Sequence, residues 1–117
     1  MNLYQQIKLA TQGDAEQEYL LGLKYYLGEE VIQDYKSSVE LFTKSAEHGF
    51  TRAQFHLGLM YYEAYGVEQD LNKAMHWFKK AARKGDIWGQ FYVALINRNH
   101  HLPHEKTRSS QFLGYDG

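Results

Sequence analysis

Apolar residues recur every three or four positions through most of the chain, and short polar or glycine-containing stretches interrupt this pattern at regular intervals. This spacing places the apolar side chains on one face of a helix, so it predicts amphipathic helices joined by short loops. The only proline is Pro103, so no earlier residue breaks a helix by removing a backbone donor. The sequence therefore predicts an all-α protein, with helices at about residues 2–11, 14–28, 35–48, 50–64, 71–84 and 86–99.

The chain also repeats itself. A shift of 36 residues aligns Gly13, Gly49 and Gly85 without a gap, and the segments 13–48 and 49–84 then share 12 identical residues in 36 positions. Self-similarity at such a period is typical of stacked helical repeats. We expect these units: an N-terminal half-repeat helix at 1–12, a degenerate repeat at 13–48, a second repeat at 49–84, the first helix of a third repeat at 85–99, and a C-terminal tail or cap at 100–117.

Each repeat is expected to contain two helices with recurring signals. Asp34 and Asp70 precede the second helix of their repeats, where a short carboxylate can accept hydrogen bonds from free backbone N–H groups. Gly22 and Gly58 lie inside the first helices, where glycine costs about 1 kcal/mol relative to alanine. Their recurrence predicts that a neighbouring helix packs closely at these two positions.

The stretch RAQFHLGLMYYEAYGVEQDLNKAMHWFKKAARKGD resembles the Sel-one-like repeat (SLR), a relative of the tetratricopeptide repeat. The resemblance covers about residues 3–98; the first repeat departs from the motif at several positions, and the third keeps only its first helix. It implies a right-handed α-solenoid of antiparallel helix pairs, about two and a half repeats long, that serves as a scaffold for protein or peptide partners and has no catalytic residues. The matching residues are Ala53, Leu57, Gly58, Tyr61, Gly66, Val67, Asp70, Lys73, Ala74, Trp77, Lys80, Ala81, Ala82 and Gly85.

Composition narrows the classes of partner. The formal net charge is −1, from 13 basic and 14 acidic residues, so the chain has no general attraction to nucleic acid or to an anionic membrane surface. No apolar run approaches the ~20 residues of a membrane span. The absence of cysteine excludes disulfides and thiolate metal sites. Because residues 1–20 lack the pattern of a secretory signal, we expect a cytoplasmic protein that binds neither nucleic acid nor membrane.

Catalytic chemistry has little support in the sequence. The six histidines are the main candidates, and HHLPHE at 100–105 places His100, His101 and His104 close to Glu105. That segment contains a proline and lies beyond the repeats, so a solvated tail is the preferred interpretation over a zinc or nickel site. No phosphate-binding glycine loop, nucleophile elbow or helical zinc motif is present. We therefore predict no enzyme activity, no cofactor and no metal.

The side of the helix on which a residue lies distinguishes predicted core residues from predicted partner-binding residues. Leu57, Gly58, Tyr61, Trp77 and Ala82 have the spacing of one buried face and are predicted to be core. A second stripe follows from superposing the concave-face positions of the related tetratricopeptide repeat on the first helices, and its aromatic and charged side chains form a predicted partner groove. The aromatic members could equally pack inward. The predicted partner-binding residues are Tyr19, Tyr26, Arg52, Phe55, Tyr62, Glu63, Trp88, Phe91 and Arg98.

These observations favour a non-catalytic interaction module, an adaptor or scaffold that binds a protein or peptide on the concave face of its first helices. The alternative is a cytoplasmic immunity or inhibitor protein that forms a one-to-one complex with a toxin or another enzyme. The sequence does not decide between the two. The apolar ends expected of a short solenoid also allow a homodimer through those ends.

Overall fold

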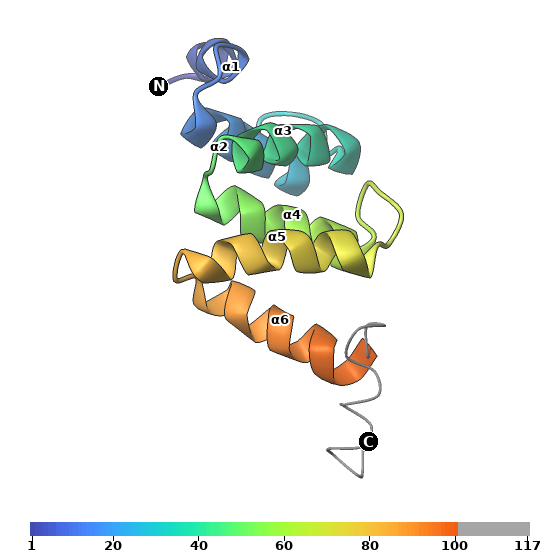
Figure 1. The fold of residues 1–117 in the computed structure, drawn as a ribbon. Coiled ribbons are helices and arrows are strands. Elements are labelled where there is room, and N and C mark those ends of the chain that lie inside the picture. Colours follow the sequence, from blue (N-terminus) through green and yellow to red (C-terminus); the bar gives the residue numbers. More distant parts are fainter. Residues whose placement is uncertain (101–117) are drawn as a thin grey trace.

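The computed structural model describes the backbone of residues 1–100 and the side chains of residues 1–99. This part of the chain is all α-helical, which confirms the predicted fold class, and it forms a stack with dimensions of 55 × 26 × 18 Å (Figure 1). The predicted tail or cap at 100–117 lies outside the described residues, apart from His100 at the end of the last helix. The six helices are α1 (Leu3–Thr11), α2 (Ala15–Leu27), α3 (Tyr35–Glu47), α4 (Thr51–Glu63), α5 (Leu71–Arg83) and α6 (Ile87–His100).

Each helix packs against the next helix in the chain, so the stack grows in sequence order from α1 to α6 (Figure 1). In the 36-residue register α2, α4 and α6 are equivalent, and we call them the first helices. By the same register α1, α3 and α5 are the second helices. This arrangement is that of a repeat protein in which every unit is stabilised mainly by its immediate neighbours.

Short polar side chains begin most of the helices, and those of Asp34 and Asp70 were predicted from the sequence. The carboxylates of Asp14, Asp34 and Asp70 accept hydrogen bonds from the first backbone N–H groups of α2, α3 and α5. The exception is α4, which begins after Phe50 and receives no side-chain hydrogen bond at its start. Phe50 instead packs its ring 5.3 Å from that of Tyr19, so this position contributes to the core and not to capping.

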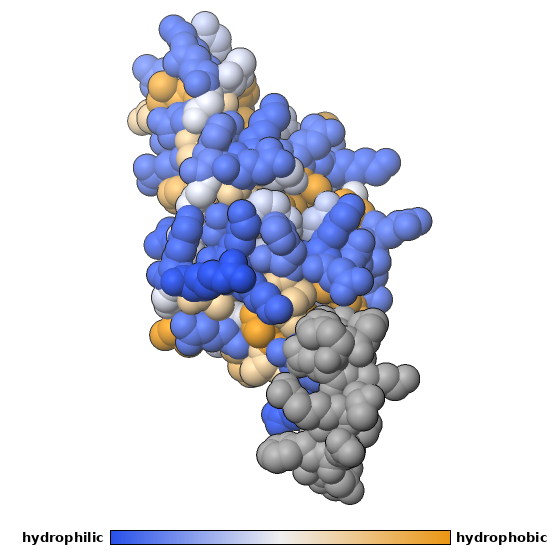
Figure 2. Space-filling model, viewed as in Figure 1, coloured by the Kyte–Doolittle hydropathy of each residue, from blue (hydrophilic) through white to orange (hydrophobic). Residues whose placement is uncertain are grey.

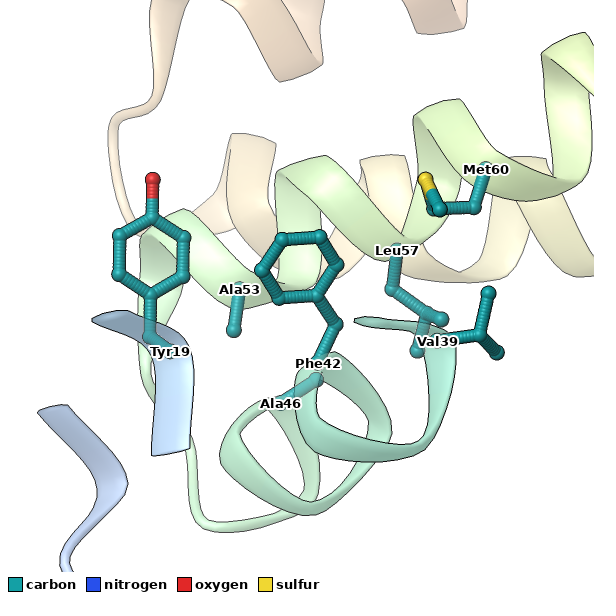
Figure 3. Packing of buried hydrophobic residues seen from close by; sticks show 7 residues of the cluster. All are labelled: Tyr19, Val39, Phe42, Ala46, Ala53, Leu57 and Met60. Atoms are coloured by element: carbon teal, nitrogen blue, oxygen red, sulfur yellow. The ribbon is translucent and has the colours of Figure 1, made fainter. Parts of the chain in front are cut away.

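The core lies between successive helices and forms two clusters. The larger one joins α2, α3 and α4, and its residues converge in Figure 3: Tyr19, Val39, Phe42, Ala46, Ala53, Leu57 and Met60. The second joins α5 and α6 through Ala74, Met75, Phe78 and Ile96. Of the residues predicted to be core, Leu57 and Gly58 are buried, Tyr61 and Trp77 are half-buried against these clusters, and Ala82 is half-buried.

The two glycines inside the first helices are explained by ring contacts. A Cβ atom at Gly22 would lie 2.8 Å from Cδ1 of Phe42, and one at Gly58 would lie 2.7 Å from Cδ1 of Phe78. Because real Cβ atoms essentially never come this close to another atom, α3 and α5 each pack a phenylalanine where only glycine leaves room. The close approach predicted from the glycine spacing is therefore present.

Hydrophilic side chains cover most of the face seen in Figure 2, and smaller areas of hydrophobic surface show over α1, at the right side of the middle of the stack, and around α6. Of the described helices, none has both the length and the apolar character needed to cross a membrane. Within the described residues no three histidine or carboxylate side chains are grouped so as to hold a metal ion. The side chains of His100, His101 and His104 lie outside the described part.

Candidate functional site: the aromatic face of the first helices

The structure brings aromatic side chains of α2, α4 and α6 into one continuous row of ring contacts. The rings of Tyr19 and His56 lie 5.4 Å apart, those of Phe55 and His56 5.3 Å apart, and those of Phe55 and Tyr92 5.9 Å apart. Phe91 follows at 5.3 Å from Tyr92. The row crosses all three first helices, and we call it the aromatic face.

Burial decreases along this row toward α6. Tyr19 is 3% exposed and belongs to the larger core cluster, so the structure assigns its ring to packing and removes it from the accessible surface. Phe55 is half-buried against Phe78, with ring centroids 5.8 Å apart. Phe91 is 50% exposed. The three residues are equivalent in the repeat, and they differ because Phe42 and Phe78 cover the first two, whereas no second helix follows α6 within the described residues.

Trp88 extends the accessible part of the aromatic face. Its side chain is 60% exposed, and its ring centroid lies 6.0 Å from that of Phe91 in an edge-on arrangement. Large aromatic surface of this kind is enriched at protein interfaces, because two rotatable side-chain bonds hold a large contact area at low entropic cost. Trp88 and Phe91 together are the part of the predicted groove that a partner could reach directly.

Tyr62 links this part to the core of the second repeat. Its ring meets those of Phe78 and Tyr92 edge-on, with centroid distances of 6.4 and 5.5 Å. Tyr92 in turn stacks on Phe78 at 4.9 Å. The sequence did not single out Tyr92, because the superposed stripe skips this helix position and its equivalents in the other repeats are Leu20 and His56. The one feature of the sequence that could have identified Tyr92 as part of the site is that it directly follows Phe91.

Tyr26 lies in a separate group of rings. It contacts Tyr35 at 5.4 Å and Tyr65 at 6.3 Å, and these two stack on each other at 4.9 Å. Burial, followed by the neighbouring Tyr35 and Tyr65 and by the carboxylate of Glu63, raises the pKa of Tyr26. The hydroxyl therefore stays protonated at neutral pH and remains able to donate a hydrogen bond.

The three charged residues of the predicted site are exposed. Glu63 follows Tyr62 at the end of α4, Arg52 lies in the first turn of the same helix, and Arg98 lies near the end of α6. Burial, with a smaller contribution from Glu63, raises the pKa of Tyr92, so that carboxylate influences the aromatic face. The site consequently offers apolar rings with charges of both signs at its margins.

His56 lies within the aromatic row but is held as a neutral side chain. Its Nδ1 atom lies 3.2 Å from the Tyr19 hydroxyl and 3.0 Å from the backbone oxygen of Arg52. Burial lowers the pKa of His56, and this outweighs the opposing effects of the Arg52 carbonyl and of the Asp86 carboxylate. The imidazole thus bridges two first helices as a packing and hydrogen-bonding group.

The geometry is that of a surface for contact. The rings pack on one another, and the half-buried histidine is already engaged by Tyr19 and Arg52. The structure brings together Tyr19, Phe55, Tyr62, Trp88 and Phe91, places Tyr26 in a neighbouring ring group, and leaves Arg52, Glu63 and Arg98 at the solvent-exposed margin. Partner binding by these residues stays a prediction.

The comparisons with known proteins agree with this architecture. The model of the Sel1 repeat family matches residues 18–50 and 51–86. These matches begin at another point of the period than the repeats at 13–48 and 49–84, as expected because a tandem repeat has no unique starting residue. No curated protein matches the chain.

Two crystal structures are similar in both sequence and fold. A protective antigen present in uropathogenic Escherichia coli strains, which displays an SLR fold, is 35% identical over 86% of this chain and 21% of its own, with a TM-score of 0.81. A Sel1 repeat protein from Oxalobacter formigenes is 33% identical over 78% of this chain and 26% of its own, with a TM-score of 0.77. The chain thus spans about a fifth to a quarter of the length of these structures. Repeat register, paired helices and family model together show that the chain belongs to the Sel1 repeat family.

Proposed function

We propose that this chain is a non-catalytic adaptor that binds a protein or peptide partner on the aromatic face of its first helices. The observation that carries the proposal is the accessible end of that face, where 60% of Trp88 and 50% of Phe91 are exposed. A solvated helix surface rarely exposes two adjacent large rings, whereas interface centres are enriched in them. Family membership supports the same class of function, since Sel1 repeats typically serve as protein-interaction scaffolds.

The charged margin fits a partner with an apolar segment flanked by polar residues. The exposed Arg52 and Arg98 would favour acidic groups of a partner, and the exposed Glu63 would favour a basic group. Tyr62 and Tyr92 pack on Phe78, so their orientation is fixed before a partner arrives. A pre-formed ring surface loses little entropy on binding.

A peptide-display selection tests the proposal. Random peptides selected on the wild-type chain should include binders that fail on the double variant Tyr62→Ala/Trp88→Ala, with an affinity loss of about 30-fold or more, the usual effect of removing interface anchors. The matched control is Tyr4→Ala, which removes an exposed aromatic ring from α1. This control should bind like the wild type. Helical circular dichroism should be unchanged in both variants.

The results separate the candidate functions. Peptides that bind the wild type and the double variant equally would contradict the proposal. If affinity capture from the native host instead yields a folded enzyme in a tight one-to-one complex that requires Trp88, the inhibitor function is favoured over the adaptor.

A further inference from the structure

The two ends of the described stack are complementary halves of a repeat. Helix α6 is a first helix, and within residues 1–100 no second helix follows it. Helix α1 is a second helix, and no first helix precedes it there. Each therefore presents a surface that the internal repeats bury between paired helices.

On α6 this surface is a groove of about 550 Å³ formed with α5. Three of its lining residues, Gln90, Val93 and Ala94, correspond after a shift of 36 residues to Gln54, Leu57 and Gly58. In the second repeat those three positions are buried, and the Phe78 ring of α5 lies directly against Gly58. The groove on α6 is thus the unfilled seat of a second helix. Its full lining is Lys79, Ala82, Arg83, Gln90, Val93, Ala94 and Asn97.

A second hollow lies on α1, at the other end of the described stack. It is lined by Met1, Gln5, Lys8, Leu9 and Gln12. The α3 residues equivalent to Gln5, Leu9 and Gln12 contact the first helix of their own repeat in three ways. Leu41 lies against Gly22, the Ser45 hydroxyl donates to the Ala15 carbonyl at 2.6 Å, and His48 Nδ1 lies 2.8 Å from Glu18 Oε1. The hollow on α1 is thus the unfilled seat of a first helix.

We propose that α1 of one copy occupies the seat on α6 of a second copy, so that the two helices complete one repeat and the molecules associate end to end. At the proposed contact some side chains differ in size from their equivalents in the internal repeats, and a smaller residue on one helix is matched by a larger residue on the other. The place of the internal phenylalanine is taken by the smaller Gln6, which is buried in the single molecule and donates to Gln17 of α2, and the place of the glycine is taken by the larger Ala94. Total volume at the contact is thereby kept, the kind of exchange that packed helices tolerate best.

Apolar and polar groups also match in this register. Leu9 takes the place of Ser45 and would face Ile87, which is 73% exposed in the single molecule. Phe91 would be covered as Tyr19 and Phe55 are, so association competes with partner binding at this residue. Gln12 and Gln90 take the places of His48 and Glu18, so their amides could replace that contact with a hydrogen bond. The contact is head-to-tail, so it leaves one free end of each kind and can continue into longer chains.

Two substitutions block one seat each. Leu9→Arg puts a long cation at a position whose equivalents in the internal repeats, Ser45 and Ala81, are fully buried, so it should block the contact. The single molecule should still fold, because Leu9 belongs to neither core cluster. Ala94→Arg fills the seat on α6 at a position that is exposed in the single molecule. Matched controls on the same two helices are Tyr4→Arg and Asn99→Arg, whose side chains are exposed and lie outside both hollows.

Sedimentation velocity on the full chain tests the proposal. The weight-average mass of the wild type and of both controls should rise between about 10 μM and about 1 mM, the range expected for a small interface. Leu9→Arg and Ala94→Arg should each remain monomeric. An equimolar mixture of these two should form dimers and nothing larger, because only the α6 seat of Leu9→Arg and the α1 of Ala94→Arg are intact.

Two outcomes would overturn the proposal. The first is a wild type that is monomeric throughout this range; faster amide exchange within residues 101–117 in Ala94→Arg would then assign the seat to this chain's own C-terminal segment. The second is an association that survives either single substitution, which would indicate another interface.

Discussion

Gly58 is the residue where the repeat has least room, because the Phe78 ring approaches to 2.7 Å from the place of a Cβ atom. We expect Gly58→Ala to lower the free energy of unfolding by about 1–2 kcal/mol, since overpacking of about 1–3 kcal/mol outweighs the gain of helix propensity. Urea unfolding measures this loss. In a Phe78→Leu background the same substitution should cost less, because the ring that it meets is gone. An equal cost in both backgrounds would contradict the contact.

His56 gives stability a defined dependence on pH. Burial lowers its pKa in the folded protein below the ordinary value of about 6.5, so the unfolded chain takes up a proton at this residue before the folded chain does. The associated stability is complete above about pH 6.5 and is lost as the pH falls below it. The groups that face the ring are the Tyr19 hydroxyl, the Arg52 carbonyl and guanidinium, and the Asp86 carboxylate.

The variant His56→Leu isolates this effect, since leucine stands at the equivalent position 20 of the first repeat. Between about pH 7.5 and about pH 5 the free energy of unfolding of the wild type should fall more steeply than that of the variant. The other ionisable groups are common to both proteins, so their contributions cancel in the difference. Parallel pH curves would show that His56 is not held neutral in the folded state.

Which aromatic residues are exposed could not be read from the sequence alone. One helical position is shared by Tyr19, Phe55 and Phe91, yet the exposed fraction of the side chain is 3% for Tyr19 and 50% for Phe91. The reason is that the phenylalanine that covers this position comes from the following second helix. The glycine contacts were predictable, since an unfavourable residue that recurs at a fixed period requires a recurring neighbour. Burial depends on what lies next to a residue in space, and a single helix phase does not contain that information.

Helix starts show how far local signals determine the elements. The side chain of Asp70 accepts a hydrogen bond from the Lys73 backbone N–H at 3.0 Å and so satisfies one of the free donors of α5. Asp70→Ala should lower the free energy of unfolding by about 1 kcal/mol, while Asp70→Asn should retain most of it, because asparagine caps nearly as well. Thermal and urea unfolding of the two variants provide the measurement. Equal losses would mean that negative charge and not the hydrogen bond is what stabilises α5.

Helix positions were predictable where such signals and the 36-residue period agree, as they do for α2, α3 and α5. The start of α4 is different, since Phe50 caps nothing and packs against Tyr19. Its position followed from the period and not from local chemistry. Here packing within the core takes the place of a capping side chain, and only the neighbouring helices reveal why.

The stack as a whole should not open as a single unit. Helix α1 has nine residues, of which only Gln6 and Ala10 are buried, and its main packing is against α2 alone. The side-chain oxygen of Gln6 is buried without a hydrogen-bond partner, which weakens this contact further. By contrast α4 packs on both α3 and α5. In a chain of nearest-neighbour interfaces, an end helix with one weak interface opens first.

Native-state hydrogen exchange can measure this gradient. At about 10 μM, where end-to-end association is minor, amides of α1 should exchange through local opening at a lower free energy than amides of α4 and α5. Ala10→Gly should lower the protection of α1 by about 1 kcal/mol, the difference in helix propensity, and leave α4 and α5 unchanged. Phe78→Leu should instead lower protection in α4, α5 and α6, because its ring contacts all three helices. Equal changes along the whole stack in either variant would show that the repeats unfold as one cooperative unit.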